Sequence, residues 1–289
     1  MTQVEINGTN LEYTERGAGQ SIVFVHPSLS DKRTWTGQLE AFGAKYRTVA
    51  YSRRYARPNE DIPDGVDDEM MVHVKDLVSF MKALQLAPAH LVGCSFGAYI
   101  CLLVARDHPK LVRTLTICEP PLLPLLGLSA PPKPSQMLGL FMRAPRTLFA
   151  VAQFGTKALQ PAVKAFNQGN DEEGWQTFAK GILGAERLNS VPEERKQQMR
   201  ENVKTLRAQL LGAGFPPFNE ADARTISVPT LLVNGGDSLA FFDRIADRLQ
   251  KWIPRVERKQ IRGGSHLMFE DQPEAFNRVV LDFLSRHSG

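Results

Sequence analysis

The chain has 289 residues, of which 43% are hydrophobic and 23% are charged. This usage is ordinary for a globular protein and excludes disordered, collagen-like and coiled-coil classes. Lys and Arg number 35 and Asp and Glu 31, which gives a net charge of +4. Because the basic residues are spread along the chain, we expect no nucleic-acid partner.

The first residues, MTQVEINGTNLEYTERG, contain neither a charged leader region nor an apolar one, and no run of 18 apolar residues occurs. The sequence therefore predicts neither export nor a membrane partner. Cys94, Cys101 and Cys118 lie in or beside apolar segments and lack metal-ligand spacing. This pattern favours buried, reduced thiols in a cytoplasmic protein without a metal site.

The first 121 residues alternate apolar runs with helical patterns. Residues 4–16 alternate apolar and polar positions around Asn7-Gly8, which predicts a hairpin with one wetted face. Buried strands are then expected at 21–27, 46–54, 89–95 and 111–121, and helices at 67–86 and 96–108. Strands that alternate with helices predict an α/β fold, in which a mostly parallel sheet carries helices on both faces.

The alternation stops between residues 122 and 224. This stretch contains helical segments separated by turns rich in Pro and Gly, and no convincing strand. Strands are expected again at 228–236 and 256–261, and helices at 239–252 and 272–286. We therefore predict an α/β core made of residues 1–121 and 225–289, with residues 122–224 as a helical cap.

The stretch HLVGCSFGAY contains Gly93-Cys94-Ser95-Phe96-Gly97, a G-x-S-x-G pattern between a predicted strand and a predicted helix. This is the context in which a sharp turn presents a nucleophilic serine. The glycines are needed because side chains two positions before and after the serine would collide. The following helix points the positive end of its dipole at any oxyanion formed at Ser95.

A serine hydroxyl needs a base within hydrogen-bond reach. His266 is the strongest candidate, because it lies in the Gly-rich stretch IRGGSHLMFEDQP after the last predicted strand, at the same end of the sheet as Ser95. Four other histidines fall on predicted helices or strand starts, where a structural role is the better expectation: His73, His90, His108 and His287.

These residues resemble those of α/β-hydrolase-fold proteins that carry a helical cap between the sixth and seventh core strands, and the resemblance covers nearly the whole chain. It implies an eight-stranded, mostly parallel sheet, a Ser-His-acid triad and no cofactor. The stretch VHPSLSDKRTW is similar to the family's oxyanion-hole loop, with Pro27 where glycine is usual. Proline has no N–H, so the expected donors are the amides of Ser28 and Phe96. His26 would shape the loop.

The acid of the triad has two candidates. In most of the family it follows the seventh strand, but here Ser238 stands at that position and Asp237 one residue earlier. Glu119, at the end of the sixth strand, is similar in position to the acid of certain dehalogenases and lactonases. An acidic group at an otherwise apolar strand end is costly to bury without a partner. We favour Glu119 and keep Asp237 as the alternative.

Two further predictions concern the surroundings. Arg53, Arg54 and Arg57 are expected in a solvated loop, with a role near the site as the alternative. Apolar residues of the cap either line a pocket for a hydrophobic substrate or fix the cap to the sheet; they include the run PPLLPLLGL and Met137, Leu138, Leu140, Phe141, Met142, Leu148, Phe149 and Phe154.

The leading hypothesis is hydrolysis of a carboxylic ester or lactone of a hydrophobic small molecule through an acyl-serine. Serine-dependent carbon–carbon bond hydrolysis, thioester hydrolysis and perhydrolysis would use the same triad. The family's epoxide hydrolases and haloalkane dehalogenases use an aspartate nucleophile, and Ser95 argues against both. A hypothesis of another class is a non-catalytic ligand receptor on the same fold. The sequence makes no prediction of oligomeric state.

Overall fold

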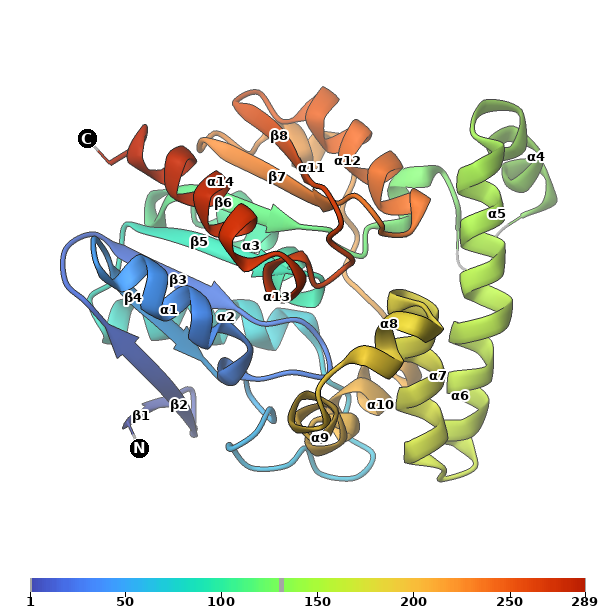
Figure 1. Ribbon diagram of the computed structural model, residues 1–289, viewed down its shortest axis with the longest axis horizontal. Helices are drawn as coiled ribbons and strands as arrows, with labels where there is room; N and C mark the ends of the chain where they lie inside the picture. The colour runs from blue at the N-terminus through green and yellow to red at the C-terminus, as the bar shows by residue number, and fades with distance from the viewer. Residues whose placement is uncertain (1, 130–132, 289) are drawn as a thin grey trace.

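The computed structural model describes residues 2–129 and 133–288 and contains one eight-stranded sheet. The strands lie in the order β1-β2-β4-β3-β5-β6-β7-β8 (Figure 1). Their bounds are Thr2–Ile6, Thr9–Arg16, Ser21–Val25, Arg47–Tyr51, Ala89–Cys94, Val112–Cys118, Thr230–Gly235 and Val256–Ile261 for β1 to β8. The pairs β1–β2 and β2–β4 are antiparallel and all others are parallel. The predicted mostly parallel sheet is confirmed.

Helices cover both faces of this sheet (Figure 1). On one face α1 (Thr36–Gly43) and α14 (Pro273–Ser285) pack in one apolar cluster with Phe24 of β3. On the other face α2 (Met70–Ala83), α3 (Phe96–Asp107) and α12 (Ala240–Trp252) bury their apolar sides in a second cluster. Strands β3, β5 and β7 are buried at every position, which explains their continuous apolar sequences.

Between β6 and β7 the described residues form the 3-10 helix η3 (Leu123–Leu126), further helices and loops but no strand, so the predicted helical insertion is confirmed. The helices are α4 (Pro134–Arg143), α5 (Pro145–Phe154), a π-helical turn η4 (Gly155–Leu159), α6 (Gln160–Asn167), α7 (Asp171–Leu183), α8 (Ala185–Ser190), α9 (Glu193–Glu201), α10 (Val203–Leu211) and α11 (Glu220–Arg224). Helices α4 to α10 gather on one side of the core (Figure 1). The division into domains at residues 121/122 and 224/225 stays a prediction.

Short elements complete the core. They are the 3-10 helices η1 (Lys32–Trp35), η2 (Pro109–Leu111) and η3 (Leu123–Leu126), and the helix α13 (Met268–Asp271). All three cysteines are buried and free. Within the ranges that the structure describes, no helix is long and apolar enough to cross a membrane.

Candidate active site

Ser95 occupies a strained turn between β5 and α3. Its backbone has φ 52° and ψ −119°, a conformation that costs a residue with a side chain about 1–3 kcal/mol. A Cβ atom on Gly97 would lie 2.3 Å from the carbonyl oxygen of Val25, and one on Gly93 would lie 2.6 Å from that of Gly97. The backbone is therefore too close at both flanking positions for any side chain.

His266 and Glu119 form a buried pair. The Nδ1 atom of His266 lies 2.7 Å from Oε2 of Glu119, and the two residues are 5% and 2% exposed. The His266 ring also stacks on Phe242, with 4.7 Å between ring centroids. A hydrogen bond from Nδ1 to a carboxylate leaves Nε2 of the ring as the proton acceptor. Packing and pairing thus fix both the orientation and the tautomer of the ring.

The carboxylate of Glu119 has two further donors at the end of β7. Its Oε1 accepts from the backbone amide of Gly235 at 2.9 Å, and its Oε2 accepts from the hydroxyl of Ser238 at 2.7 Å. Asp237 is placed elsewhere: its side chain is 57% exposed, and Oδ2 lies 3.3 Å from Nη2 of Arg187. Ser238, which stands where the resemblance expects an acid, instead donates a hydrogen bond to Glu119, which follows β6.

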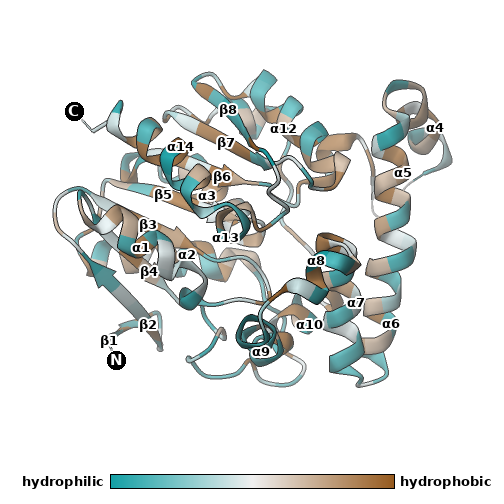
Figure 2. Cartoon of the chain, viewed as in Figure 1, coloured by the Kyte–Doolittle hydropathy of each residue, from teal (hydrophilic) through white to brown (hydrophobic). Residues whose placement is uncertain are grey.

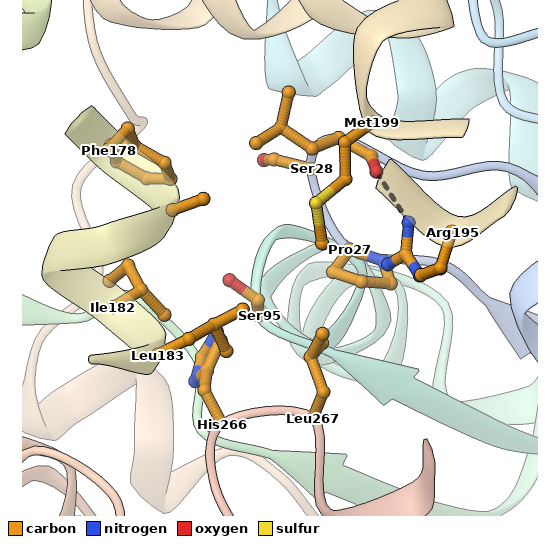
Figure 3. Close-up of a pocket in the computed structure, with 12 residues that line it drawn as sticks. Pro27, Ser28, Ser95, Phe178, Ile182, Leu183, Arg195, Met199, His266 and Leu267 are labelled. Carbon is orange, nitrogen blue, oxygen red and sulfur yellow. Dashed lines mark hydrogen bonds between the residues drawn. The ribbon is translucent and has the colours of Figure 1, made fainter. Parts of the chain in front are cut away.

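Ser95 and His266 lie beside each other in the wall of one pocket (Figure 3). The remaining wall comes from Pro27, Ser28, Leu29, Phe178, Ala179, Ile182, Leu183, Arg195, Met199 and Leu267. Among the hydrogen bonds of the described residues, none joins Ser95 Oγ to His266. Such bonds often form fully only when substrate binds. The pocket therefore joins a serine, a paired imidazole and largely apolar walls.

The loop after β3 faces this pocket. Within the described residues, no turn, loop or cap hydrogen bond engages the amide of Ser28 or of Phe96, the two expected oxyanion donors. His26 holds the loop, because its Nδ1 bonds the carbonyl of Pro27 at 2.8 Å and its Nε2 accepts from the amide of Arg53 at 2.9 Å. Burial, together with the charge of Arg53, lowers the pKa of His26 well below 6.5.

Arg53 corrects the prediction of a solvated arginine cluster, since it is only 2% exposed. Its guanidinium carbon lies 4.5 Å from the centroid of the Phe96 ring, and Nη2 donates to the carbonyl of Pro27 at 3.3 Å. Burial lowers the pKa of Arg53. This cation packs directly behind the two expected oxyanion donors, and its sequence context of loop-forming residues gave no sign of that burial.

A chain of hydrogen bonds connects the loop after β3, which carries Ser28, to the helical insertion. The hydroxyl of Ser28 donates to Oε1 of Gln209 in α10 at 2.6 Å, and Nε2 of Gln209 donates to Asp68 at 2.7 Å. The other oxygen of Asp68 bonds Nε2 of His73 at 2.7 Å. Burial raises the pKa of Asp68, but the charges of His73 and Arg53 outweigh burial and the pKa is lowered.

Arg195 of α9 is a second connection that the sequence did not indicate. Its Nε lies 3.0 Å from Oε1 of Glu270, and its Nη1 donates to the carbonyl of Leu29 at 3.0 Å (Figure 3). Thr34 donates a hydrogen bond to the same Glu270 oxygen. Arg195 therefore joins the insertion to the oxyanion loop and to the segment that follows His266.

Of the two alternatives for the apolar residues of α4 and α5, the structure favours packing against the core over lining the pocket. The insertion lines the pocket from α7 and α9 instead, through Phe178, Ala179, Ile182, Leu183, Arg195 and Met199. Leu148 and Phe154 pack against the core cluster, whereas Leu138, Phe141, Met142 and Phe149 are exposed. Composition alone could not indicate which helices face the serine.

Comparisons with known proteins find relatives that match nearly the whole chain. The chain is 22% identical over 299 residues to bifunctional epoxide hydrolase 2 of Sus scrofa, covering 96% of this chain and 53% of that protein, so it spans about half of that relative. It is 25% identical over 291 residues to the non-heme chloroperoxidase CPO-A1 of Kitasatospora aureofaciens, covering 97% and 98% of the two chains.

Among solved structures, the enol-lactonase of Burkholderia xenovorans LB400 superimposes with a TM-score of 0.73 at 18% identity, over 98% of this chain and 100% of that one. At this identity the likeness is one of fold. The family model described as "Alpha/beta hydrolase family" matches residues 22–279. The chain therefore belongs to the alpha/beta hydrolase family.

Proposed function

We propose that the protein hydrolyses carboxylic esters or lactones of hydrophobic small molecules through an acyl-serine intermediate. The observation that carries the proposal is the 2.7 Å pair of His266 and Glu119 in a pocket shared with Ser95. A nucleophile, a base and a group that orients the base are the parts that acyl transfer requires.

In the first half-reaction the Ser95 oxygen attacks the acyl carbon, and His266 Nε2 accepts the hydroxyl proton. Glu119 stabilises the imidazolium because its carboxylate remains bonded at Nδ1. The amides of Ser28 and Phe96 would donate to the oxyanion, and α3 directs the positive end of its dipole toward that charge. The imidazolium then protonates the alcohol oxygen as the C–O bond breaks.

In the second half-reaction water attacks the acyl-serine, with His266 as its base, and the carboxylic acid is released. For a lactone the alcohol and the acid remain in one product molecule. The apolar side chains of the pocket, such as Phe178, Ile182 and Met199, support a substrate with hydrophobic bulk.

The test is hydrolysis of p-nitrophenyl esters, from acetyl to octanoyl, and of γ- and δ-lactones. We expect turnover by the wild type, and a loss of at least about a thousandfold in kcat for Ser95→Ala. Ser190→Ala, at an exposed position in α8, serves as the matched control. A fluorophosphonate should label the wild type once, as read by intact mass, and should leave Ser95→Ala unlabelled.

Two results would contradict the proposal. Unchanged ester turnover in Ser95→Ala would remove the nucleophile from the mechanism. A folded wild type that hydrolyses neither the esters nor the lactones would remove the reaction itself, and would favour a receptor or a different scissile bond.

A further inference from the structure

The outward face of α4 is apolar. Leu138, Phe141 and Met142 are 64%, 53% and 74% exposed, and their i, i+3, i+4 spacing places them on one side of the helix. Leu140, on the opposite side, is buried in the core cluster. On α5, Phe149 is 77% exposed. Exposed apolar side chains grouped on one face of a helix can mark an interaction surface.

The charge around these side chains has one sign. Residues 120–170 contain five basic side chains and no acidic one; they are Lys133, Arg143, Arg146, Lys157 and Lys164. All five are exposed. None of them forms an ion pair with another described residue, whereas Arg187, Arg195, Arg200 and Arg207 elsewhere in the insertion all do. Lys133 before α4, Arg143 at its end and Arg146 at the start of α5 thus flank the apolar face, without an ion-pair partner among the described residues.

Helices α4 and α5 lie at the outer edge of the molecule, on the side away from β1 (Figures 1 and 2). We use the term α4–α5 surface for the apolar residues Leu138, Phe141, Met142 and Phe149 together with the rim cations Lys133, Arg143 and Arg146. None of these residues lines the pocket described above. A partner on this surface would not compete with a ligand for the residues around Ser95.

We propose that the α4–α5 surface docks the protein on an anionic lipid bilayer. Apolar side chains on one helix face can enter the boundary between headgroups and acyl chains while basic side chains bind lipid phosphates. A second copy of the chain fits less well, because a two-fold contact brings the same patch against itself. It would place the unpaired cations of one copy against those of the other, with no acidic group within 120–170 to neutralise them.

The inference concerns peripheral contact through side chains, which is independent of the proposed reaction. It revises the expectation that the protein has no membrane partner. That expectation rested on the absence of a leader region and of a run long enough to span the bilayer. An exposed amphipathic helix produces neither of these signals.

The test is co-sedimentation of the full chain with vesicles of phosphatidylcholine alone or mixed with phosphatidylglycerol. We expect binding to the mixed vesicles that weakens as salt is raised, and little binding to pure phosphatidylcholine. The variant L138S/F141S/M142S should lower the partition coefficient at least about tenfold. The variant K133Q/R143Q/R146Q should lower it about a hundredfold, since each basic residue contributes about fivefold.

Matched controls change the same chemistry elsewhere. V66S/L211S alters two side chains that are 42% and 41% exposed, and K75Q/K110Q/K251Q removes the same total charge from exposed positions without ion pairs among the described residues. Both should bind the mixed vesicles within about threefold of the wild type. Circular dichroism verifies that each variant is folded.

Three outcomes would overturn the inference: no binding to mixed vesicles, equal binding to neutral and anionic vesicles, or equal losses in the control variants. A solution mass of two chains that L138S/F141S/M142S converts to one would also overturn it, because the surface would then be a protein interface.

Discussion

At the scale of single residues, Glu119 is the best-supported group of the site. Its two carboxylate oxygens accept from a backbone amide, a hydroxyl and an imidazole, and its own backbone has a positive φ of 47°. A residue with a side chain keeps such a conformation only where the surroundings over-determine it. The strain at Glu119 and at Ser95 therefore occurs at the two strand ends that meet His266.

Replacing Glu119 by Gln tests which acid serves the triad. We expect kcat/KM for a p-nitrophenyl ester to fall by about a thousandfold or more, because an amide cannot stabilise the imidazolium and favours the wrong tautomer. Asp237→Asn is the matched control, and it should change kcat/KM by less than about threefold, since its exposed pair with Arg187 contributes little. The reverse ranking would transfer the role to Asp237.

At the scale of elements, α10 is coupled to the loop that carries Ser28, the proposed oxyanion donor. The side-chain amide of Gln209 accepts a hydrogen bond from Ser28 and also donates one to Asp68. The position of α10 and the position of the loop that carries Ser28 are therefore not independent. A buried bond to a charged acceptor stabilises by about 1.5–3 kcal/mol. We therefore expect a movement of the insertion to shift the position of the Ser28 amide.

The variant Gln209→Leu measures this coupling. We expect kcat to fall several-fold with a smaller change in KM, and Tm to fall by several degrees, because Asp68 loses a buried donor. Ser28→Ala keeps the loop amide and removes only the hydroxyl. If the bond carries the effect, the double variant should lose less kcat than the sum of the two single losses, in free-energy terms. Strict additivity would contradict the coupling.

At the scale of the whole molecule, the insertion and the core share buried polar contacts as well as apolar ones. The carboxylate of Asp31 accepts from Gln198 at 2.8 Å and from Asn202 at 2.9 Å. Trp175 of α7 belongs to the same apolar cluster as Trp35 of η1. These contacts predict that the two parts unfold in one transition.

The variant W35F/W252F leaves Trp175 as the only tryptophan, so its fluorescence reports the insertion alone. In urea we expect the fluorescence midpoint to coincide with the midpoint by far-UV circular dichroism, which reports the whole chain. A fluorescence transition that clearly precedes the dichroism transition would show that the insertion unfolds separately.

Local patterns predicted the core strands and the turn at Ser95, because a fully buried strand and a G-x-S-x-G turn each have a signature within a few consecutive residues. Helix α1 was missed, since only Leu39 and Phe42 provide apolar burial along its eight residues. The burial of Arg53 and the bond between Gln209 and Asp68, 141 residues apart, depend on tertiary contacts that no local pattern records. For the same reason the sequence left open whether Glu119 or Asp237 reaches His266.

The insertion begins after β6, which Glu119 directly follows, and this has a practical consequence. Ser28, Ser95 and Glu119 lie on one uninterrupted segment, whereas His266 lies beyond the insertion. A chain divided within the insertion would place the proposed nucleophile and acid on one fragment and the proposed base on the other. The parallel pairing of β6 with β7 would have to re-form between the fragments before ester turnover could return. Two proteins that bind each other, fused to the two fragments, would bring the fragments together. Restored turnover would then report their association.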